Sequence, residues 1–146
     1  IKYFDGAVLQ LPARTMQDDL RGPYLVMQRY HGQKIPYSLL MQAWSVEMAE
    51  EPLVIAVTSM DSSDPISTRP VEARQFRQED FAMAVAAWNG QGLEGARERL
   101  KAKGFTQVCL HLNFLPRQDV ADVKSLMLKE LGEPDQRTAE ALLWQL

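Results

Sequence analysis

The sequence predicts an α+β domain in which helices pack on one face of a mainly antiparallel sheet. Aromatic and β-branched runs separated by turn residues dominate residues 1–60, as in strands. Beyond residue 80, apolar residues recur at helical spacing instead. The length of 146 residues suits a single domain covering 1–146. The expected order is β-β-β-β-α-α-β-α-α, and strands followed mostly by helices favour the α+β class.

Three strands are expected before residue 50. The first covers residues 2–11, which are largely apolar. Residues 24–30 and 33–43 are aromatic and aliphatic runs on either side of His31-Gly32. Because a short Gly-containing break between two such runs is a turn signal, they predict a β-hairpin.

A fourth strand is expected over residues 53–59, whose sequence is LVIAVTS. This continuous, β-branched run lies between Pro52 and the polar loop 61–65. A short apolar run bounded by turn residues is typical of a buried strand.

Two helices are expected next. Apolar residues at i, i+3, i+4 and i+7 predict the first one, which glycines 90 and 92 then interrupt. Its apolar stripe is Phe81, Ala84, Val85 and Trp88. The second helix carries Leu93, Ala96 and Leu100. Gly104 follows at the position where glycine commonly ends a helix.

The C-terminal third is expected to contain one strand and two further helices. Residues 105–114 alternate between apolar and polar side chains, which predicts a strand. Residues 120–131 carry an apolar stripe that ends at Gly132, and they predict a helix. Asp135 is expected to cap a last helix that ends at Leu146.

Composition excludes several function classes. The formal net charge is −3 and the pI is about 5.4, which argues against a nucleic-acid partner because such partners need concentrated Lys and Arg. Cys109 is the one cysteine, so neither an intramolecular disulfide nor a multi-cysteine zinc site is expected. No apolar run reaches the roughly 18–20 residues that span a bilayer. The sequence predicts no cofactor, and it assigns no compartment.

The strand 105–114 offers one catalytic hypothesis. Cys109, His111 and Asn113 occupy alternate positions and therefore project to the same side. A nucleophilic thiol needs a neighbouring base, and that base needs an orienting group. The residue types fit, but a half-buried strand with one polar face accounts for the same pattern.

Residues 90–95 offer a second hypothesis, because they read G-x-G-x-x-G. In a dinucleotide site such glycines let a pyrophosphate approach a helix N-terminus, and Asn113 lies at the distance expected for the ribose partner. That fingerprint must follow a strand, whereas the Ala- and Met-rich segment before Gly90 has helical periodicity. A glycine-containing link between two helices is the simpler interpretation.

Large, adaptable side chains gather in the first half of the chain, which contains five of the seven methionines. Methionine and aromatic residues are frequent on surfaces that accept partners, although they also fill cores. The residues assigned here to partner or ligand binding are Tyr24, Tyr30, Tyr37, Met41 and Trp44.

The sequence therefore favours a non-enzymatic binding module, an adaptor or accessory domain, whose partner is another protein or a second copy of the chain. The alternative is a carrier of an apolar small molecule or acyl chain, in which the same residues line a cavity. The third hypothesis is an enzyme that uses Cys109 with His111.

Overall fold

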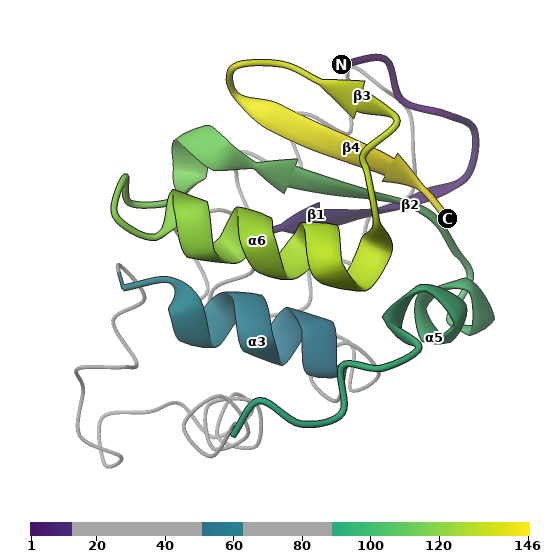
Figure 1. The fold of residues 1–146 in the computed structure, drawn as a ribbon. Coiled ribbons are helices and arrows are strands. Elements are labelled where there is room, and N and C mark those ends of the chain that lie inside the picture. The colour runs from purple at the N-terminus through teal and green to yellow at the C-terminus, as the bar shows by residue number, and fades with distance from the viewer. Residues whose placement is uncertain (13–50, 63–88) are drawn as a thin grey trace, which may run out of the picture.

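The computed structural model describes residues 1–12, 51–62 and 89–146 (Figure 1). Within these ranges, the chain forms four strands, three α-helices and one 3-10 helix. In chain order they are β1 (Ala7–Leu11), α3 (Pro52–Met60), α5 (Ala96–Ala102), β2 (Phe105–His111), η3 (Leu112–Phe114), α6 (Val120–Leu131), β3 (Gln136–Arg137) and β4 (Ala141–Gln145). The combination of a sheet with helices confirms the α+β class.

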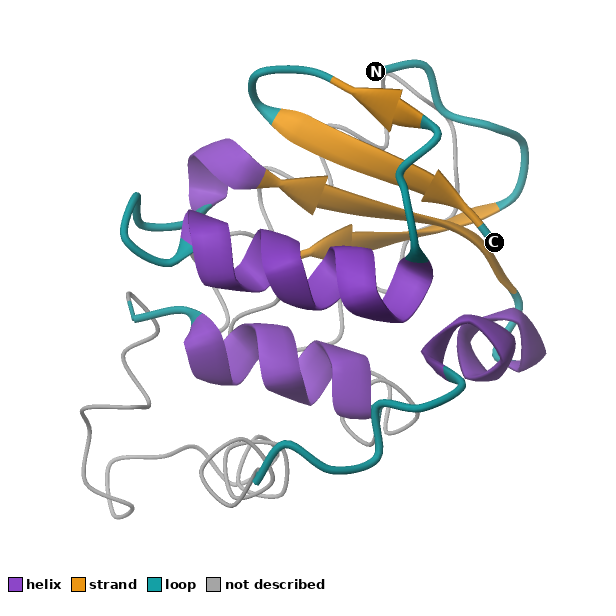
Figure 2. Cartoon of the chain, in the orientation of Figure 1, coloured by secondary structure: helices purple, strands orange, loops and turns teal. Residues whose placement is uncertain are grey.

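The sheet is mixed, so the prediction of a mainly antiparallel sheet is wrong. Its strand order is β1-β2-β4-β3. β1 runs parallel to β2, whereas β2 and β4, and β3 and β4, are antiparallel. The expected element order is also wrong, because the described elements read β-α-α-β-α-β-β apart from η3. Helices α6 and α3 lie side by side on one face of the sheet, and α5 packs at one end of α6 and β2 (Figures 1 and 2).

Residues 53–59 form helix α3 rather than the expected strand. Pro52 occupies the first helical turn, where its missing N–H is not needed, and the Glu51 side chain accepts a bond from the Leu53 N–H at 3.4 Å. The helix is buried at every position from Leu53 to Thr58. A helix surrounded by protein has no polar face, so its sequence shows the same continuous apolar run as a buried strand.

Residues 136–145 form the β3–β4 hairpin rather than a last helix. β4 lies between β2 and β3 and is buried from Ala141 to Trp144. A strand that is buried on both faces loses the alternation that identifies strands in a sequence. Asp135 does not cap a helix; its carboxylate accepts the Gln145 N–H at 2.7 Å.

Several other expectations are confirmed. β1 occupies the second half of the predicted strand 2–11, α5 lies within the second predicted helix, and α6 coincides with the predicted helix 120–131. The predicted strand 105–114 ends earlier, at His111, and its last three residues form η3. The predicted hairpin around His31 and the predicted helix over residues 81–88 lie outside the described residues.

The core between the sheet and the helices is apolar. The sheet contributes alternate residues of β1, β2 and β4, and all three α-helices contribute their buried faces. The sheet residues on this side are Leu9, Leu11, Val108, Leu110, Leu142 and Trp144. The residues between them in sequence point to the opposite side, which we call the second face. The second face is therefore the side of the sheet opposite α3 and α6.

A buried ion pair joins the start of α3 to α5. The Glu51 side chain is fully buried and that of Arg99 is 32% exposed, with Nη2 of Arg99 3.0 Å from Oε1 of Glu51. Nε of Arg99 also donates to both carboxylate oxygens, at 3.2 and 3.3 Å. The same guanidinium donates to the main-chain carbonyls of Leu93 and Glu94. This pair therefore fixes the loop before α5 against α3.

Replacing Arg99 with Met should destabilise the fold, because it leaves the Glu51 carboxylate buried without its counter-ion. We expect a loss of about 3 kcal/mol, the lower end for broken buried pairs because Arg99 is partly exposed. Urea unfolding of the purified chain measures this loss. Adding Glu51→Gln to Arg99→Met should recover part of it, since the amide can still cap α3. A change of less than about 0.5 kcal/mol for Arg99→Met would contradict the assignment.

Candidate functional site

The second face of the sheet carries four buried polar or titratable side chains. Gln10 comes from β1, and Gln107, Cys109 and His111 come from β2. The side chains of Gln10, Gln107 and Cys109 are inaccessible to solvent, and His111 is 6% exposed. Since buried polar groups are costly unless they form hydrogen bonds, their partners define what this face does.

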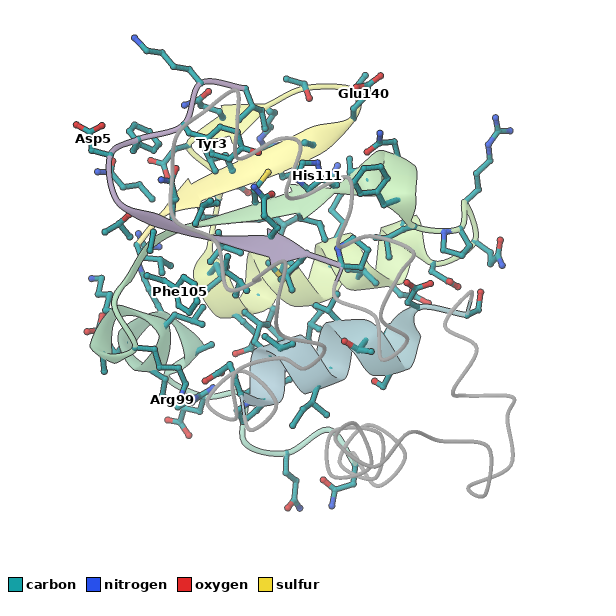
Figure 3. The ribbon with its side chains drawn as sticks, turned by 180° about the vertical axis from the view of Figure 1, so that it is seen from behind. Tyr3, Asp5, Arg99, Phe105, His111 and Glu140 are labelled. Carbon is teal, nitrogen blue, oxygen red and sulfur yellow. The ribbon has the colours of Figure 1, made fainter. Side chains whose placement is uncertain are left out.

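Four side chains form one hydrogen-bond network on this face: Tyr3, Gln10, Cys109 and His111. Tyr3 and His111 are labelled in Figure 3. The Tyr3 hydroxyl lies 3.5 Å from both Oε1 of Gln10 and Sγ of Cys109. Sγ of Cys109 is 3.4 Å from Nε2 of His111, and that nitrogen forms a short hydrogen bond with Oε1 of Gln10. The parallel register places Gln10 directly beside Cys109, so adjacent strands assemble the network.

Burial makes Cys109 a poor nucleophile. It raises the pKa of the thiol to about 12, and the hydrogen bond from Tyr3 offsets this effect only in part. Burial also raises the pKa of the Tyr3 hydroxyl, and the neighbouring Cys109 raises it further. Both groups are therefore protonated near neutral pH. A thiol in this state attacks substrates slowly, because the thiolate is the reactive form.

The Cys109, His111 and Asn113 set is assembled only in part. The first two are in contact, but an amide oxygen can only accept, so Nε2 of His111 donates its proton to Gln10 Oε1. With its proton in place, this nitrogen cannot remove the proton of the thiol. Asn113 lies in η3 and is exposed, and so it does not orient the imidazole. The His111 ring instead stacks on Phe114 at 5.2 Å.

Two glutamine side chains on or beside this face bind the main chain of residues 1–6, which we call the N-terminal segment. Oε1 of Gln136 accepts the Lys2 N–H at 2.8 Å, and Nε2 of Gln136 donates to the Lys2 carbonyl at 2.6 Å. Gln107 repeats this pattern at Phe4, with 3.0 Å to its N–H and 2.7 Å to its carbonyl. We call these two contacts the glutamine clamps. They hold the main chain at Lys2 and Phe4, which are separated by one residue.

The glutamine clamps were missed by sequence reasoning for different reasons. Gln107 lies on the expected polar face of its strand, but nothing in the sequence indicates its partner 103 positions away. Gln136 falls in a region that the sequence predicts as helical. Tyr24, Tyr30, Tyr37, Met41 and Trp44, which the sequence analysis assigned to binding, lie outside the described residues.

The glycine segment 90–95 does not form a phosphate cradle. Such cradles direct main-chain N–H groups at an anion. Here the carbonyls of Leu93 and Glu94 accept hydrogen bonds from the Arg99 guanidinium. This guanidinium lies close to Gly95, and its charge is paired with the Glu51 carboxylate. The helix that follows has only seven residues. The geometry agrees with a structural link and gives no support to a dinucleotide site.

The described part of the chain offers neither a metal site nor a membrane-spanning helix. Within it, no group of three or more His, Cys, Asp or Glu side chains is placed to hold a metal ion. None of the described helices has the length and apolarity needed to cross a membrane.

Comparisons with protein-family models, with curated protein sequences and with solved structures found no match to this chain. The functional inference therefore rests on the chemistry of the second face.

Cys109 should react very slowly with thiol reagents in the folded protein. With a pKa of about 12, roughly one molecule in ten thousand carries the thiolate at pH 8, and Sγ is inaccessible. We expect labelling by a disulfide reagent to be at least about 1,000-fold slower than in the urea-unfolded chain. The unfolded chain is the matched control. Equal rates in the two states would show that the thiol is not buried in the network.

Proposed function

We propose that this protein is a non-enzymatic binding module that uses the second face of its sheet to hold a protein partner. The pair of glutamine clamps carries the proposal, because it is a ready arrangement for recognising a polypeptide main chain. A glutamine amide offers one acceptor and two donors, and therefore matches the N–H and C=O of one residue. Recognition of this kind supplies affinity without requiring a particular side chain.

The spacing of the glutamine clamps favours an extended ligand. They hold residues i and i+2, and in an extended chain these two residues present their main-chain groups towards the same side. Gln107 comes from the central strand β2 and Gln136 from the edge strand β3. The site thus reaches from the middle of the sheet to its edge, as a binding surface for a short stretch of polypeptide needs.

The state of Cys109 favours binding over catalysis. Its pKa of about 12 keeps the thiol protonated, and His111 directs its proton to Gln10. The network thereby satisfies buried polar groups and leaves none of these atoms as an available nucleophile–base pair. The earlier assignment of Tyr24, Tyr30, Tyr37, Met41 and Trp44 to partner binding stays a prediction.

The proposal predicts that peptides selected for binding to the 146-residue chain will depend on Gln136. Selection from a random peptide library gives the ligands, and fluorescence anisotropy gives their affinities. Replacing Gln136 with Leu removes two main-chain hydrogen bonds. At about 1 kcal/mol each, this loss should weaken binding about tenfold or more.

Gln91→Leu is the matched control, because Gln91 is an exposed glutamine in the glycine segment before α5, away from the second face. This variant should bind the selected peptides as tightly as the unmodified chain. Equal weakening by both substitutions, or selection of no peptide at all, would overturn the proposal. A bound mass of a few hundred daltons in native mass spectrometry, without peptide binding, would instead favour the apolar carrier.

A further inference from the structure

The N-terminal segment is bound to the second face much as a separate peptide would be. Four of its hydrogen bonds to the sheet join the glutamine clamps to main-chain atoms of Lys2 and Phe4. These contacts do not depend on the segment being part of the same chain. The segment has no strand assignment, and it passes from β1 towards β3 (Figure 3).

Two adjacent aromatic side chains give the segment its specificity. Tyr3 and Phe4 pack against the apolar part of the second face, which consists of Val8, Cys109, Ala141 and Leu143. The Tyr3 hydroxyl also joins the network through Gln10 and Cys109. An amphipathic phenol suits this site, because its ring is partly buried while its hydroxyl finds polar partners.

The segment joins β1 at Gly6, which packs closely against Thr106 of β2. Gly6 has a φ of 116°, a conformation that L side chains rarely adopt, and a Cβ there would collide with Thr106. Pairing of β1 with β2 begins at the next residue, Ala7. Thr106 Oγ1 donates to the carbonyls of both Asp5 and Ala7, at 3.1 and 3.2 Å. Departure of residues 1–4 would break the bonds of the glutamine clamps, and none of these bonds belongs to the β1–β2 ladder.

We propose that residues 1–6 are an intramolecular occupant of a site whose partner ligand is an extended peptide with two adjacent aromatic residues. The inference rests on the proposed function and adds two things to it: the chemistry of the ligand, and competition by the chain's own N-terminal segment. A tethered occupant acts at an effective concentration in the millimolar range. It therefore lowers the apparent affinity of any ligand supplied from outside.

The test uses the 146-residue chain and a fluorescent peptide with the sequence of residues 1–6, IKYFDG. Replacing Tyr3 and Phe4 with Ala in the protein weakens the tethered occupant but leaves both clamping glutamines in place. We expect this double variant to bind the peptide at least about tenfold more tightly than the unmodified chain, because competition at millimolar effective concentration is reduced.

Peptide controls identify the contacts. The peptide IKAADG lacks both aromatic rings and should not bind the double variant. A peptide methylated at the amide nitrogen of its Phe cannot donate to the Gln107 side chain, and it should bind at least about tenfold more weakly. Adding Gln136→Leu to the double variant should weaken IKYFDG binding to a similar extent. Equal affinity of the double variant and the unmodified chain would overturn the inference, as would tight binding of IKAADG.

The unmodified chain supplies a second test that does not require a variant to fold. Excess IKYFDG should displace the N-terminal segment and accelerate hydrogen exchange at the Phe4 amide, which Gln107 holds. An unchanged exchange rate at saturating peptide would overturn the inference. If library-selected peptides still depend on Gln136 in that case, the proposed function stands and only the intramolecular competition is wrong.

Discussion

The burial of β2 on both faces is the constraint on which the rest of this structure depends. β2 lies between β1 and β4, with the helices over one side and the second face on the other. Its residues that face the helices are apolar, so their side chains require no hydrogen-bond partners. On the second face, Gln107, Cys109 and His111 are polar or titratable and lie out of solvent. Because buried polar groups destabilise a fold unless they form hydrogen bonds, this face requires the partners that Gln10 and the N-terminal segment supply.

The need of these buried polar groups for hydrogen-bond partners also bears on the chemistry of Cys109 and Gln107. Burial keeps the thiol of Cys109 protonated although the hydrogen bond from Tyr3 lowers its pKa, so the same burial that completes the core disfavours nucleophilic chemistry. Gln107 lies outside the network around Cys109, because its partner is a main chain rather than a side chain. A buried amide that needs one N–H and one C=O is satisfied by any extended segment that reaches it. The proposed binding function therefore uses the same groups that the sheet must satisfy by hydrogen bonds.

The sequence predicts the amphipathic elements well and the fully buried ones poorly. The predicted strand 105–114, which forms β2 up to His111, and the helix 120–131 each have two chemically different sides, and the period of the pattern gives the element type. Residues 53–59 and 141–145 are buried nearly all round, so apolar runs appear in both without a period that separates helix from strand. The candidate site follows the same rule. The sequence predicts that Cys109 and His111 share one side of a strand, but it does not indicate their partners Tyr3 and Gln10. Gln136 likewise contacts residue 2 through a pairing that no local pattern encodes.

The central claim is that the glutamine clamps hold the N-terminal segment on the second face, and NMR of the isotope-labelled 146-residue chain tests it most directly. The account predicts nuclear Overhauser contacts from the side-chain amide protons of Gln136 to Lys2 and from those of Gln107 to Phe4. It also predicts contacts between the Tyr3 ring and Cys109. Random-coil shifts for residues 2–4 together with the absence of these contacts would contradict it.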